Sequence, residues 1–365
     1  MSSTVITPPR VARAGLLLCA ALVAAACGTR DTSLVPTSPT YSIGNPVNTG
    51  ANNPFTLAVI GDTPYGPAKF AELPSLVALI NSDPKVDLVA HLGDLKSGKN
   101  GPCSNEYFSS VKDVFDGLKD PFVYTPGDNE WTDCHVAKKN NGLYTPTERL
   151  QFIRSLFFPV AGETLGGRKK QVLTQADDPA NSDYVENVMW MQSQVVFVTL
   201  NVTGSNDDLV PWGLPLPADA GNYPSQAAER VARTKANAAW LDKAFALAAD
   251  NDAQGVVVMM QADMWDTLEP SLSGFDGYVQ QLGTRAISFA RPVLLLEGDS
   301  HIYKTDNPFS ANDPLHAVHA STPVAENVTR IVVEGSSGRT EYLRLTVDPK
   351  TKGGALFRWE RVPLQ

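Results

Sequence analysis

The stretch FTLAVIGD, at residues 55–62, joins an apolar, β-branched run to a Gly-Asp pair. A run of this length before a glycine is typical of a buried strand that ends in a turn. Similar apolar runs follow at residues 88–92, 122–124, 195–200, 255–260 and 293–297. Longer amphipathic segments separate the runs, so the sequence predicts an α/β domain.

Short polar motifs close five of these runs: GD at 61–62, GD at 93–94, TPGDNE at 125–130, QAD at 261–263 and GDSH at 298–301. A single Gly-Asp pair is ordinary turn chemistry, but turns alone do not explain four of them at the ends of apolar runs. The carboxyl ends of parallel strands in an α/β sheet face one crevice. Carboxylates gathered there repel each other unless a cation neutralises them, so the pattern predicts a metal site.

The C-terminal part of the chain has a different pattern. Runs at residues 330–334, 342–347 and 356–359 are separated by turn residues and predict strands of an antiparallel edge or a second sheet. Among the helical segments, residues 227–248 are the clearest. We expect one face of that helix to be buried, the face that carries Val231, Ala238, Leu241, Phe245 and Ala248.

The composition bounds the class of protein. The chain has 365 residues, a formal net charge of −9 and 43% apolar residues. These values are ordinary for a globular protein and exclude disorder of the whole chain. Its basic cluster at residues 168–170 is short, so we expect no nucleic-acid partner.

The N-terminus has the layout of a secretory signal peptide. Arg10 and Arg13 precede a short apolar run that ends in VAAAC at residues 23–27, which resembles a bacterial lipobox. We therefore expect a lipid anchor at the cell envelope, on the periplasmic face of the outer membrane, as the only membrane contact. Plain cleavage, which would leave a soluble periplasmic protein, is the alternative. The predicted organisation is a signal peptide at 1–26, lipidation of Cys27, a tether at 27–53 and a folded domain at 54–365.

Export also bears on the cysteines. Outside the signal peptide and the lipid site, two remain, Cys103 and Cys134. In an oxidising compartment such a pair predicts a disulfide that closes a loop of about 30 residues and restrains the unfolded chain. A metal site that uses both cysteines is the alternative.

The motifs GDTPYG, GDLKSG, GDNEW and GDSH, in this order and spacing, resemble those of the calcineurin-like metallophosphoesterase superfamily. The resemblance covers residues 55–359. It points to a divergent bacterial lipoprotein group with the signature TPGDNEWxDC, which stands here at residues 125–134. The resemblance implies a four-layer sandwich, in which two packed mixed β-sheets are flanked by α-helices.

The resemblance also implies the metal ligands. Asp62 would bind a first metal and Asp94 would bridge two metals, with further ligands from Asp128, Gln261, Asp299 and His301. Several histidines of the family pattern are replaced, which leaves a donor set made mostly of oxygens. Such a set favours one or two divalent ions of Mn, Mg, Ca or Fe over Zn.

The family mechanism implies attack of a metal-bound water on phosphorus, followed by protonation of the leaving group. Asn129 stands where the family has its catalytic histidine, and an amide cannot give up a proton. His135 is therefore our first candidate for the acid, and Glu130 is the second.

Substrate contacts are expected from polar side chains near the same strand ends. Lys96, placed at the rim, would hold a phosphate oxygen, and Asn201 and Asn206 would add polar contacts. For Tyr65, packing is the expected use, ahead of substrate or metal binding.

Two functions follow from these residues. The first is a cell-envelope, metal-dependent phosphoesterase that hydrolyses a small phosphomonoester or phosphodiester. The alternative is a catalytically inactive lipoprotein of the same fold that binds a cation or a partner. The retained carboxylates and His301 favour the enzyme, because unpaired buried carboxylates would otherwise destabilise the fold.

Overall fold

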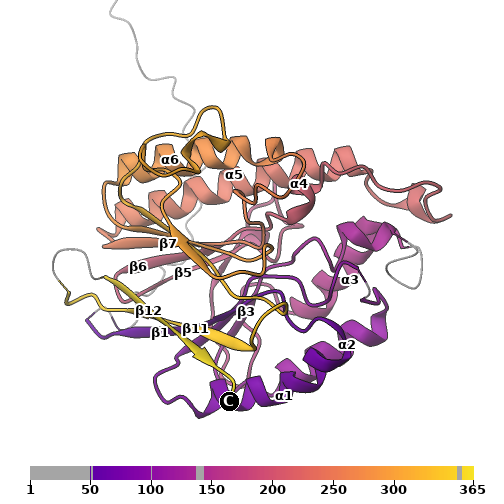
Figure 1. Ribbon diagram of the computed structural model, residues 1–365, viewed down its shortest axis with the longest axis horizontal. Helices are drawn as coiled ribbons and strands as arrows, with labels where there is room; N and C mark the ends of the chain where they lie inside the picture. The colour runs from indigo at the N-terminus through magenta and orange to yellow at the C-terminus, as the bar shows by residue number, and fades with distance from the viewer. Residues whose placement is uncertain (1–49, 51, 100, 137–143, 352–355) are drawn as a thin grey trace, which may run out of the picture. The chain divides into compact units, whose positions relative to one another are not determined.

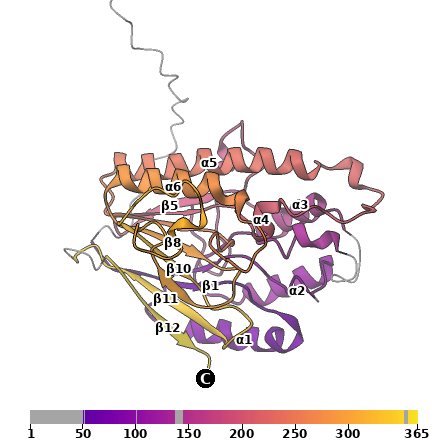
Figure 2. The same cartoon turned by 45° about the horizontal axis from the view of Figure 1, so that its top comes forward.

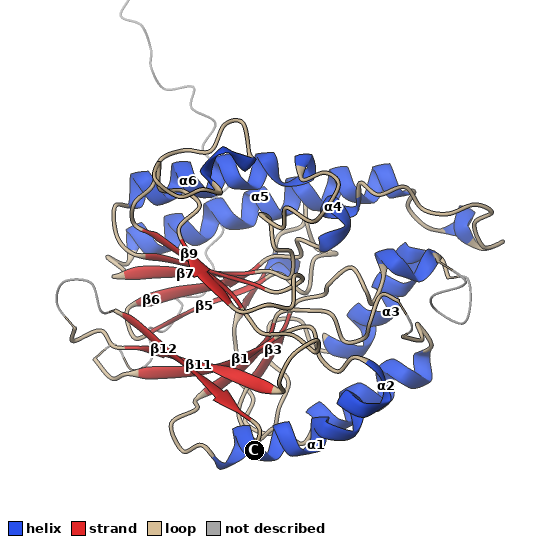
Figure 3. Ribbon diagram, in the orientation of Figure 1, coloured by secondary structure: helices blue, strands red, loops and turns tan. Residues whose placement is uncertain are grey.

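In the computed structural model, two β-sheets pack face to face between two layers of helices (Figures 1 and 3). The structure describes residues 50, 52–99, 101–136, 144–351 and 356–365. The signal peptide, Cys27 and most of the tether predicted at 27–53 lie outside the described residues. At the tether's end, the carbonyl oxygen of Asn53 accepts a hydrogen bond of 2.7 Å from Ser193 Oγ.

The smaller sheet has the strand order β12-β11-β1-β2-β3. Its members are β1 (Phe55–Ile60), β2 (Leu88–His91), β3 (Phe122–Tyr124), β11 (Glu341–Val347) and β12 (Phe357–Pro363). The strands β1, β2 and β3 run parallel, whereas β11 and β12 are antiparallel to their neighbours. The predicted antiparallel strands at 342–347 and 356–359 are thus confirmed.

The larger sheet has the order β4-β5-β6-β7-β8-β10-β9. Its members are β4 (Leu173–Thr174), β5 (Val188–Gln192), β6 (Val195–Thr199), β7 (Gly255–Met259), β8 (Val293–Glu297), β9 (Lys304–Asp306) and β10 (Val328–Val332). The strand predicted at residues 330–334 is β10 of this second sheet, which pairs antiparallel with the edge strand β9 and parallel with β8. The long connection through β9 brings the chain back to the start of β8 before β10 begins, so the two strands run the same way.

Helices cover the outer face of each sheet. Those on the smaller sheet are α1 (Gly66–Ser82), α2 (Asn105–Phe115) and α3 (Pro146–Phe157). The larger sheet is covered by α5 (Gln226–Asp250) and α6 (Asp276–Phe289), which lie together in Figure 2. Short elements complete the fold: α4 (Gly204–Asp208) and the 3-10 turns η1 (Thr132–His135), η2 (Gln175–Asp177), η3 (Ala220–Asn222), η4 (Ser273–Phe275) and η5 (His316–Val318).

Strand periodicity explains the three apolar layers. In β1, Leu57 and Val59 enter the core between the sheets, whereas Ala58 and Ile60 pack against the helices. A strand directs successive side chains to opposite faces, so a continuously apolar run can fill two cores at once. The predicted architecture of two packed mixed sheets flanked by helices is confirmed.

The face of α5 differs from the prediction in its first half. Val231 is 68% exposed, whereas Leu241, Phe245 and Ala248 are buried as expected. The buried face near the start of the helix carries Arg233, with Glu229 and Asn237 on either side. Apolar periodicity could not predict this face, because its buried side chains are charged or polar. Searched over the described residues, the structure has no helix long and apolar enough to cross a membrane.

Candidate metal centre and active site

The carboxyl ends of parallel strands from both sheets meet at one place. Asp62 lies two residues after β1 and Asp94 three residues after β2, while Asp128 follows β3 in the smaller sheet. From the larger sheet, Gln261 follows β7 and Asp299 follows β8. The crevice predicted from the polar motifs is therefore present, and the edges of two sheets form it together.

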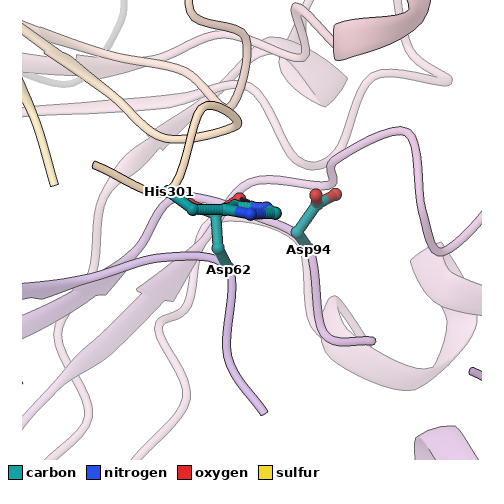
Figure 4. Close-up of side chains that lie close together, drawn as sticks. All are labelled: Asp62, Asp94 and His301. Atoms are coloured by element: carbon teal, nitrogen blue, oxygen red, sulfur yellow. Dashed lines mark ion pairs between the residues drawn. The ribbon is translucent and has the colours of Figure 1, made fainter. Parts of the chain in front are cut away.

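Two groups of side chains are close enough to hold cations. Asp62, Asp94 and His301 form the first, and Asp94, Asp128 and Asp299 form the second. Within each group the ligand atoms all lie within 4.8 Å of one another. Asp94 belongs to both groups. Figure 4 shows the first group, whose side chains come from three separate segments, with the ring of His301 extending toward Asp94.

The backbone at four of these five residues is in the left-handed region. The φ angles are 51° at Asp62, 66° at Asp94, 69° at Asp299 and 62° at His301. L-residues adopt this conformation rarely, and it persists where the surroundings over-determine it, often at functional sites. The chain thus turns sharply after β1, β2 and β8, and each turn carries a ligand side chain at the crevice.

The buried carboxylates of the site repel one another when no cation is bound. Burial, together with the neighbouring charges, raises the pKa of Asp62, Asp94 and Asp299 well above its usual value. The same causes raise the pKa of Asp128 to about 7. A cation would reverse these shifts. The oxygen-rich donor set therefore suits a divalent metal ion, and its chemistry matches hard ions.

Tyr65 lies at the centre of the first group. Its hydroxyl donates to Asp94 Oδ2 at 2.6 Å and is 3.2 Å from His301 Nε2. Asn129 Nδ2 donates to the same hydroxyl at 2.8 Å. The prediction that Tyr65 serves for packing is wrong, because its polar atom faces the ligands. The available signal was its position three residues after Asp62 in the motif GDTPYG.

Asn129 and Glu130 both hold Asp94. Asn129 Nδ2 donates to Asp94 Oδ2 at 2.5 Å, so the amide lies inside the site. Glu130 is wholly buried, and its Oε1 accepts from the backbone nitrogens of Asp94 and Gly127 and from Tyr124 Oη. This geometry corrects the role proposed for Glu130: it fixes the backbone of the loops and does not reach a leaving group.

The side chain of Gln261 connects the site to α4. Its Oε1 accepts from the backbone nitrogen of Gly204 at 2.6 Å, and its Nε2 lies 3.4 Å from Asp128 Oδ1. A Cβ atom on Gly204 would lie 2.7 Å from Asp299 Oδ2 and 2.8 Å from Asp128 Oδ2. The backbone of Gly204 therefore rests directly on the second group, and only glycine allows this approach.

The four residues after Gly204 form a left-handed turn. Their φ angles are 53°, 57°, 54° and 61° from Ser205 to Asp208. This conformation costs roughly 1–2 kcal/mol for each L-residue, so strong contacts must hold it. Arg233, which is wholly buried, pairs with Asp207 and also donates to the Asp207 carbonyl oxygen at 3.2 Å. The turn places Ser205 Oγ 2.7 Å from Asp128 Oδ2, a site contact that the sequence prediction did not include.

The family model for calcineurin-like phosphoesterases matches residues 55–238, which is more than half of the chain. This chain belongs to the calcineurin-like phosphoesterase family. The matched residues contain β1, β2 and β3 with Asp62, Asp94 and Asp128 at their ends, so the family match and the geometry agree on this half of the site.

Comparison with solved structures finds similar folds. GAP50, the anchor in the inner membrane complex of Plasmodium, is 10% identical over 86% of this chain and 89% of that chain, with a TM-score of 0.45. A 5'-nucleotidase from Candida albicans is 9% identical over 85% of this chain and 51% of that chain, with a TM-score of 0.44. A search of curated proteins finds no match.

Two substrate contacts expected in this calcineurin-like phosphoesterase are corrected by the structure. Lys96 is wholly buried and donates to Ser97 O at 3.1 Å, so it does not stand at the rim. Asn201 is also wholly buried, and its Nδ2 donates to Glu186 Oε1 at 2.8 Å. Asn201 contacts Glu186 and Asn187, which lie before β5, and Arg233 and Asn237 on α5, and its position in the sequence alone does not reveal these contacts.

Asn206 and His135 lie in the loops around the crevice. Asn206 Oδ1 accepts from the backbone nitrogen of Gly274 at 2.7 Å, which ties α4 to η4. His135 is buried at the end of η1, with Nδ1 2.6 Å from Thr132 O. The predicted acid role of His135 and the substrate contact of Asn206 stay predictions.

The disulfide between Cys103 and Cys134 is confirmed. Both sulfur atoms lie next to the carbonyl oxygen of Asn129, at 4.0 Å for Cys103 and 3.7 Å for Cys134. The bond joins the residues before α2 to η1 and thus supports the loop that carries Asp128 and Asn129. It therefore acts directly beneath the site.

Supporting contacts also fix the first group. Ser337 Oγ lies 3.0 Å from His301 Nδ1, which leaves Nε2 facing Tyr65 and Asp62. His91 joins two loops, because its Nε2 lies 2.8 Å from Thr63 O and its Nδ1 accepts from Gly93 N. Such contacts orient ligands and tune their affinity for a metal.

Proposed function

We propose that this protein is a metal-dependent phosphoesterase that hydrolyses a small phosphomonoester or phosphodiester. The observation that carries the proposal is the position of Asp94, which belongs to both groups of candidate ligands. Membership of the calcineurin-like phosphoesterase family supports the reaction class. A divalent cation bound there would lower the pKa of a water molecule and polarise phosphoryl oxygens.

The chain's own residues would hold the reacting groups in place. Asp62, Asp94 and His301 would hold one cation, and Asp128 and Asp299 would complete a second position around Asp94. Tyr65 and Asn129 hold the Asp94 carboxylate by hydrogen bonds to its Oδ2. One or two ions of Mn, Mg, Ca or Fe suit this oxygen-rich set better than Zn.

Protonation of the leaving group needs a donor other than Asn129. His135 is the candidate from sequence, on a loop that the disulfide holds near Asp128. Tyr65 is the candidate from geometry, because its hydroxyl already lies among the ligands. A cation would lower the pKa of the Tyr65 hydroxyl, which burial and the carboxylates raise in the metal-free site.

The proposed location is the cell envelope. A signal peptide at 1–26 and lipidation of Cys27 would anchor the domain through residues 27–53, with no other membrane contact. The alternative is a soluble periplasmic protein. The proposed partner is a small phosphorylated substrate, with no nucleic acid.

One observation favours a second function, an inactive binding protein. Asn129 occupies the position of the family's catalytic histidine, and its amide nitrogen donates hydrogen bonds to Asp94 and Tyr65. In that case the acidic crevice would bind a cation or a partner without hydrolysis.

Metal content and turnover of one sample separate the two functions. Elemental mass spectrometry on residues 28–365, purified without chelator, would be combined with assays on an aryl phosphate and a bis-aryl phosphate with and without Mn²⁺. Bound metal with Mn²⁺-dependent turnover is the expected result, and Asp94→Asn should abolish both. Asp183→Asn, at an exposed position, is the matched control. Metal without turnover on either probe would favour the binding protein, and absence of metal would refute both.

A further inference from the structure

One short segment of the candidate site supplies a ligand to each group. Asp299 belongs to the second group and His301 to the first, and Ser300 separates them in the chain. The backbone on both sides of Ser300 is in the left-handed region, with φ angles of 69° at Asp299 and 62° at His301. This conformation is unfavourable for L-residues, so other contacts must hold it. Whatever fixes Ser300 therefore bears on both groups at once.

The side chain of Ser300 contacts charged residues that belong to neither group. Its Oγ accepts from Lys304 Nζ at 3.2 Å, and the same Nζ donates to Asp263 Oδ2 at 3.1 Å. A side-chain hydrogen bond also joins Ser300 to Asp263. Arg330 Nη1 donates to the other oxygen of Asp263, Oδ1. We call these four residues, Asp263, Ser300, Lys304 and Arg330, the loop clamp.

The loop clamp is built into the larger sheet. Asp263 and Arg330 are 1% and 0% exposed. Lys304 is the first residue of β9, and Arg330 lies on β10. Arg330 also pairs with Asp306 of β9 and with Glu297 at the end of β8. Buried charges are stable only when their partners are in place, so these pairs hold the Asp263 carboxylate in a fixed position.

The ionisation of Asp263 differs from that of the candidate ligands. Burial acts to raise its pKa, but the charges of Arg330 and Lys304 and the hydrogen bond from Ser300 lower the pKa below its usual value. The pKa of Asp299, in contrast, is raised well above its usual value by burial and by neighbouring carboxylates. Cations of the chain itself therefore balance the Asp263 carboxylate, which gives it a different role from that of a metal ligand.

We propose that Asp263 and Lys304 are positioning residues for the metal site. Through Ser300 they hold the left-handed segment at 299–301, so that Asp299 and His301 reach their two groups together. The short strand β9 begins three residues after His301 and thus places Lys304 beside this segment. The inference rests on the proposed function, because it concerns the metal on which hydrolysis would depend.

Two substitutions at partly exposed positions test the loop clamp while the buried pair of Asp263 with Arg330 stays intact. Ser300→Ala removes the hydroxyl, and Lys304→Met removes an ammonium group whose side chain is 34% exposed. We expect each to weaken Mn²⁺ binding by about tenfold or more in isothermal titration, as is common when a contact that orients a ligand is lost. Electrostatics alone predicts the opposite for Lys304→Met, because loss of a nearby positive charge favours a cation.

A double variant and a rescue show whether the two side chains act together. Ser300→Ala combined with Lys304→Met should bind Mn²⁺ about as weakly as the weaker single variant, because both substitutions break the same hydrogen bond. Lys304→Arg keeps a cationic donor and should recover part of the affinity. Lys112→Met is the matched control, since it removes a comparable pair with Asp116 on α2 and should keep the wild-type affinity.

A spectroscopic readout separates positioning from a general loss of stability. The electron paramagnetic resonance spectrum of bound Mn²⁺ depends on the geometry of its ligands. It should change in Ser300→Ala and in Lys304→Met, and stay as in the wild type in Lys112→Met. Melting temperatures without metal should confirm that each variant is folded.

The other outcomes overturn the inference in distinguishable ways. Wild-type affinity and an unchanged spectrum in Ser300→Ala and Lys304→Met refute the loop clamp, and Mn²⁺-dependent hydrolysis by the wild type then leaves the phosphoesterase proposal standing. Tighter binding in Lys304→Met limits Lys304 to an effect of its charge. Additive losses in the double variant refute a shared action through Ser300. A wild-type protein that binds no Mn²⁺ and hydrolyses neither aryl phosphate refutes the proposed function together with the inference.

Discussion

The hydroxyl oxygen of Tyr65 lies 2.6 Å from Oδ2 of Asp94, the residue shared by the two candidate ligand groups. Asn129 donates to both of these oxygen atoms, so the three side chains form one closed set of hydrogen bonds. The phenol therefore helps to fix the carboxylate on which both cation positions depend.

Replacing Tyr65 tests that dependence. Tyr65→Phe keeps the ring and removes the hydroxyl, and we expect Mn²⁺ affinity to fall by about tenfold or more, as is common when a contact that orients a ligand is lost. Isothermal titration with Mn²⁺ measures the change. Tyr342→Phe is the control, because the Tyr342 hydroxyl contacts Asp83 away from the site. Equal affinities for the two variants would contradict the role of Tyr65.

Asp299→Asn should separate stability from metal binding. Burial raises the pKa of Asp299, and the neighbouring charges of Asp128 and Asp62 raise it further. Removing its charge should stabilise the metal-free protein at pH 8 by about 1 kcal/mol or more and weaken Mn²⁺ binding. Urea denaturation in EDTA and metal titration give the two readouts. A variant less stable than wild type without metal would argue against charge repulsion at this site.

The metal-free protein should lose stability as the pH rises. In the folded state the pKa of Asp128 is about 7, above its usual 3.8, and those of Asp62, Asp94 and Asp299 are raised as well. The folded protein therefore holds protons that the unfolded chain has released. The free energy of unfolding must then fall as the pH rises from about 4 to 7.

His91 acts in the opposite direction in part of this range. Burial lowers its pKa to about 4, so it contributes stability that is lost as the pH falls below about 6.5. The contribution of His91 to the free energy of unfolding is that of one group, and four carboxylates contribute in the opposite direction. Melting temperatures in EDTA should therefore decrease between pH 5 and 8, and added Mn²⁺ should raise them most at pH 8. A flat profile in EDTA would refute the crowding of these carboxylates.

Two substitutions at Ser205 distinguish strain from function. Ser205→Ala and Ser205→Gly both remove the hydroxyl that contacts Asp128 and Asp133, so both should weaken Mn²⁺ binding equally. Only glycine relieves the φ of 53°, so Ser205→Gly should be the more stable variant by about 1 kcal/mol. Ser288→Ala on α6 controls for loss of a surface hydroxyl. Unchanged Mn²⁺ affinity in both variants would limit Ser205 to a role in the turn.

The disulfide should support both the fold and the site. Cys103 and Cys134 are 31 residues apart, and replacing both with serine should lower the free energy of unfolding by about 3–4 kcal/mol in the chain-entropy estimate. Because the sulfurs lie beside the Asn129 carbonyl, Mn²⁺ affinity should fall too. Urea denaturation and metal titration check the two effects. Two free thiols in the wild-type protein, counted after unfolding without a reducing agent, would refute the bond.

Much of the fold could be predicted from local patterns in the sequence. The strands β1, β3 and β8 begin and end where the apolar runs do, because a strand buried on both faces needs an unbroken apolar sequence. The Gly-Asp pairs marked the strand ends, since a sharp turn and a carboxylate are properties of adjacent residues. For the same reason Asp62, Asp94, Asp128 and Asp299 could be identified without a structure.

Contacts between distant segments decided the rest. Lys96 and Asn201 stand next to strand ends in sequence, yet the fold buries both side chains. The hydroxyl of Tyr65 faces the ligands, and its place three residues after Asp62 was the one sequence signal for this contact. Apolar periodicity also gives no sign of the buried pair of Arg233 with Asp207, because these charges and their further partners, Glu229 and Arg230, come together only when the chain folds. Sequence alone determined which residues end the strands, since that depends on adjacent residues. Only the tertiary structure decided which polar atoms reach the site, because burial and charge pairing depend on segments that meet after folding.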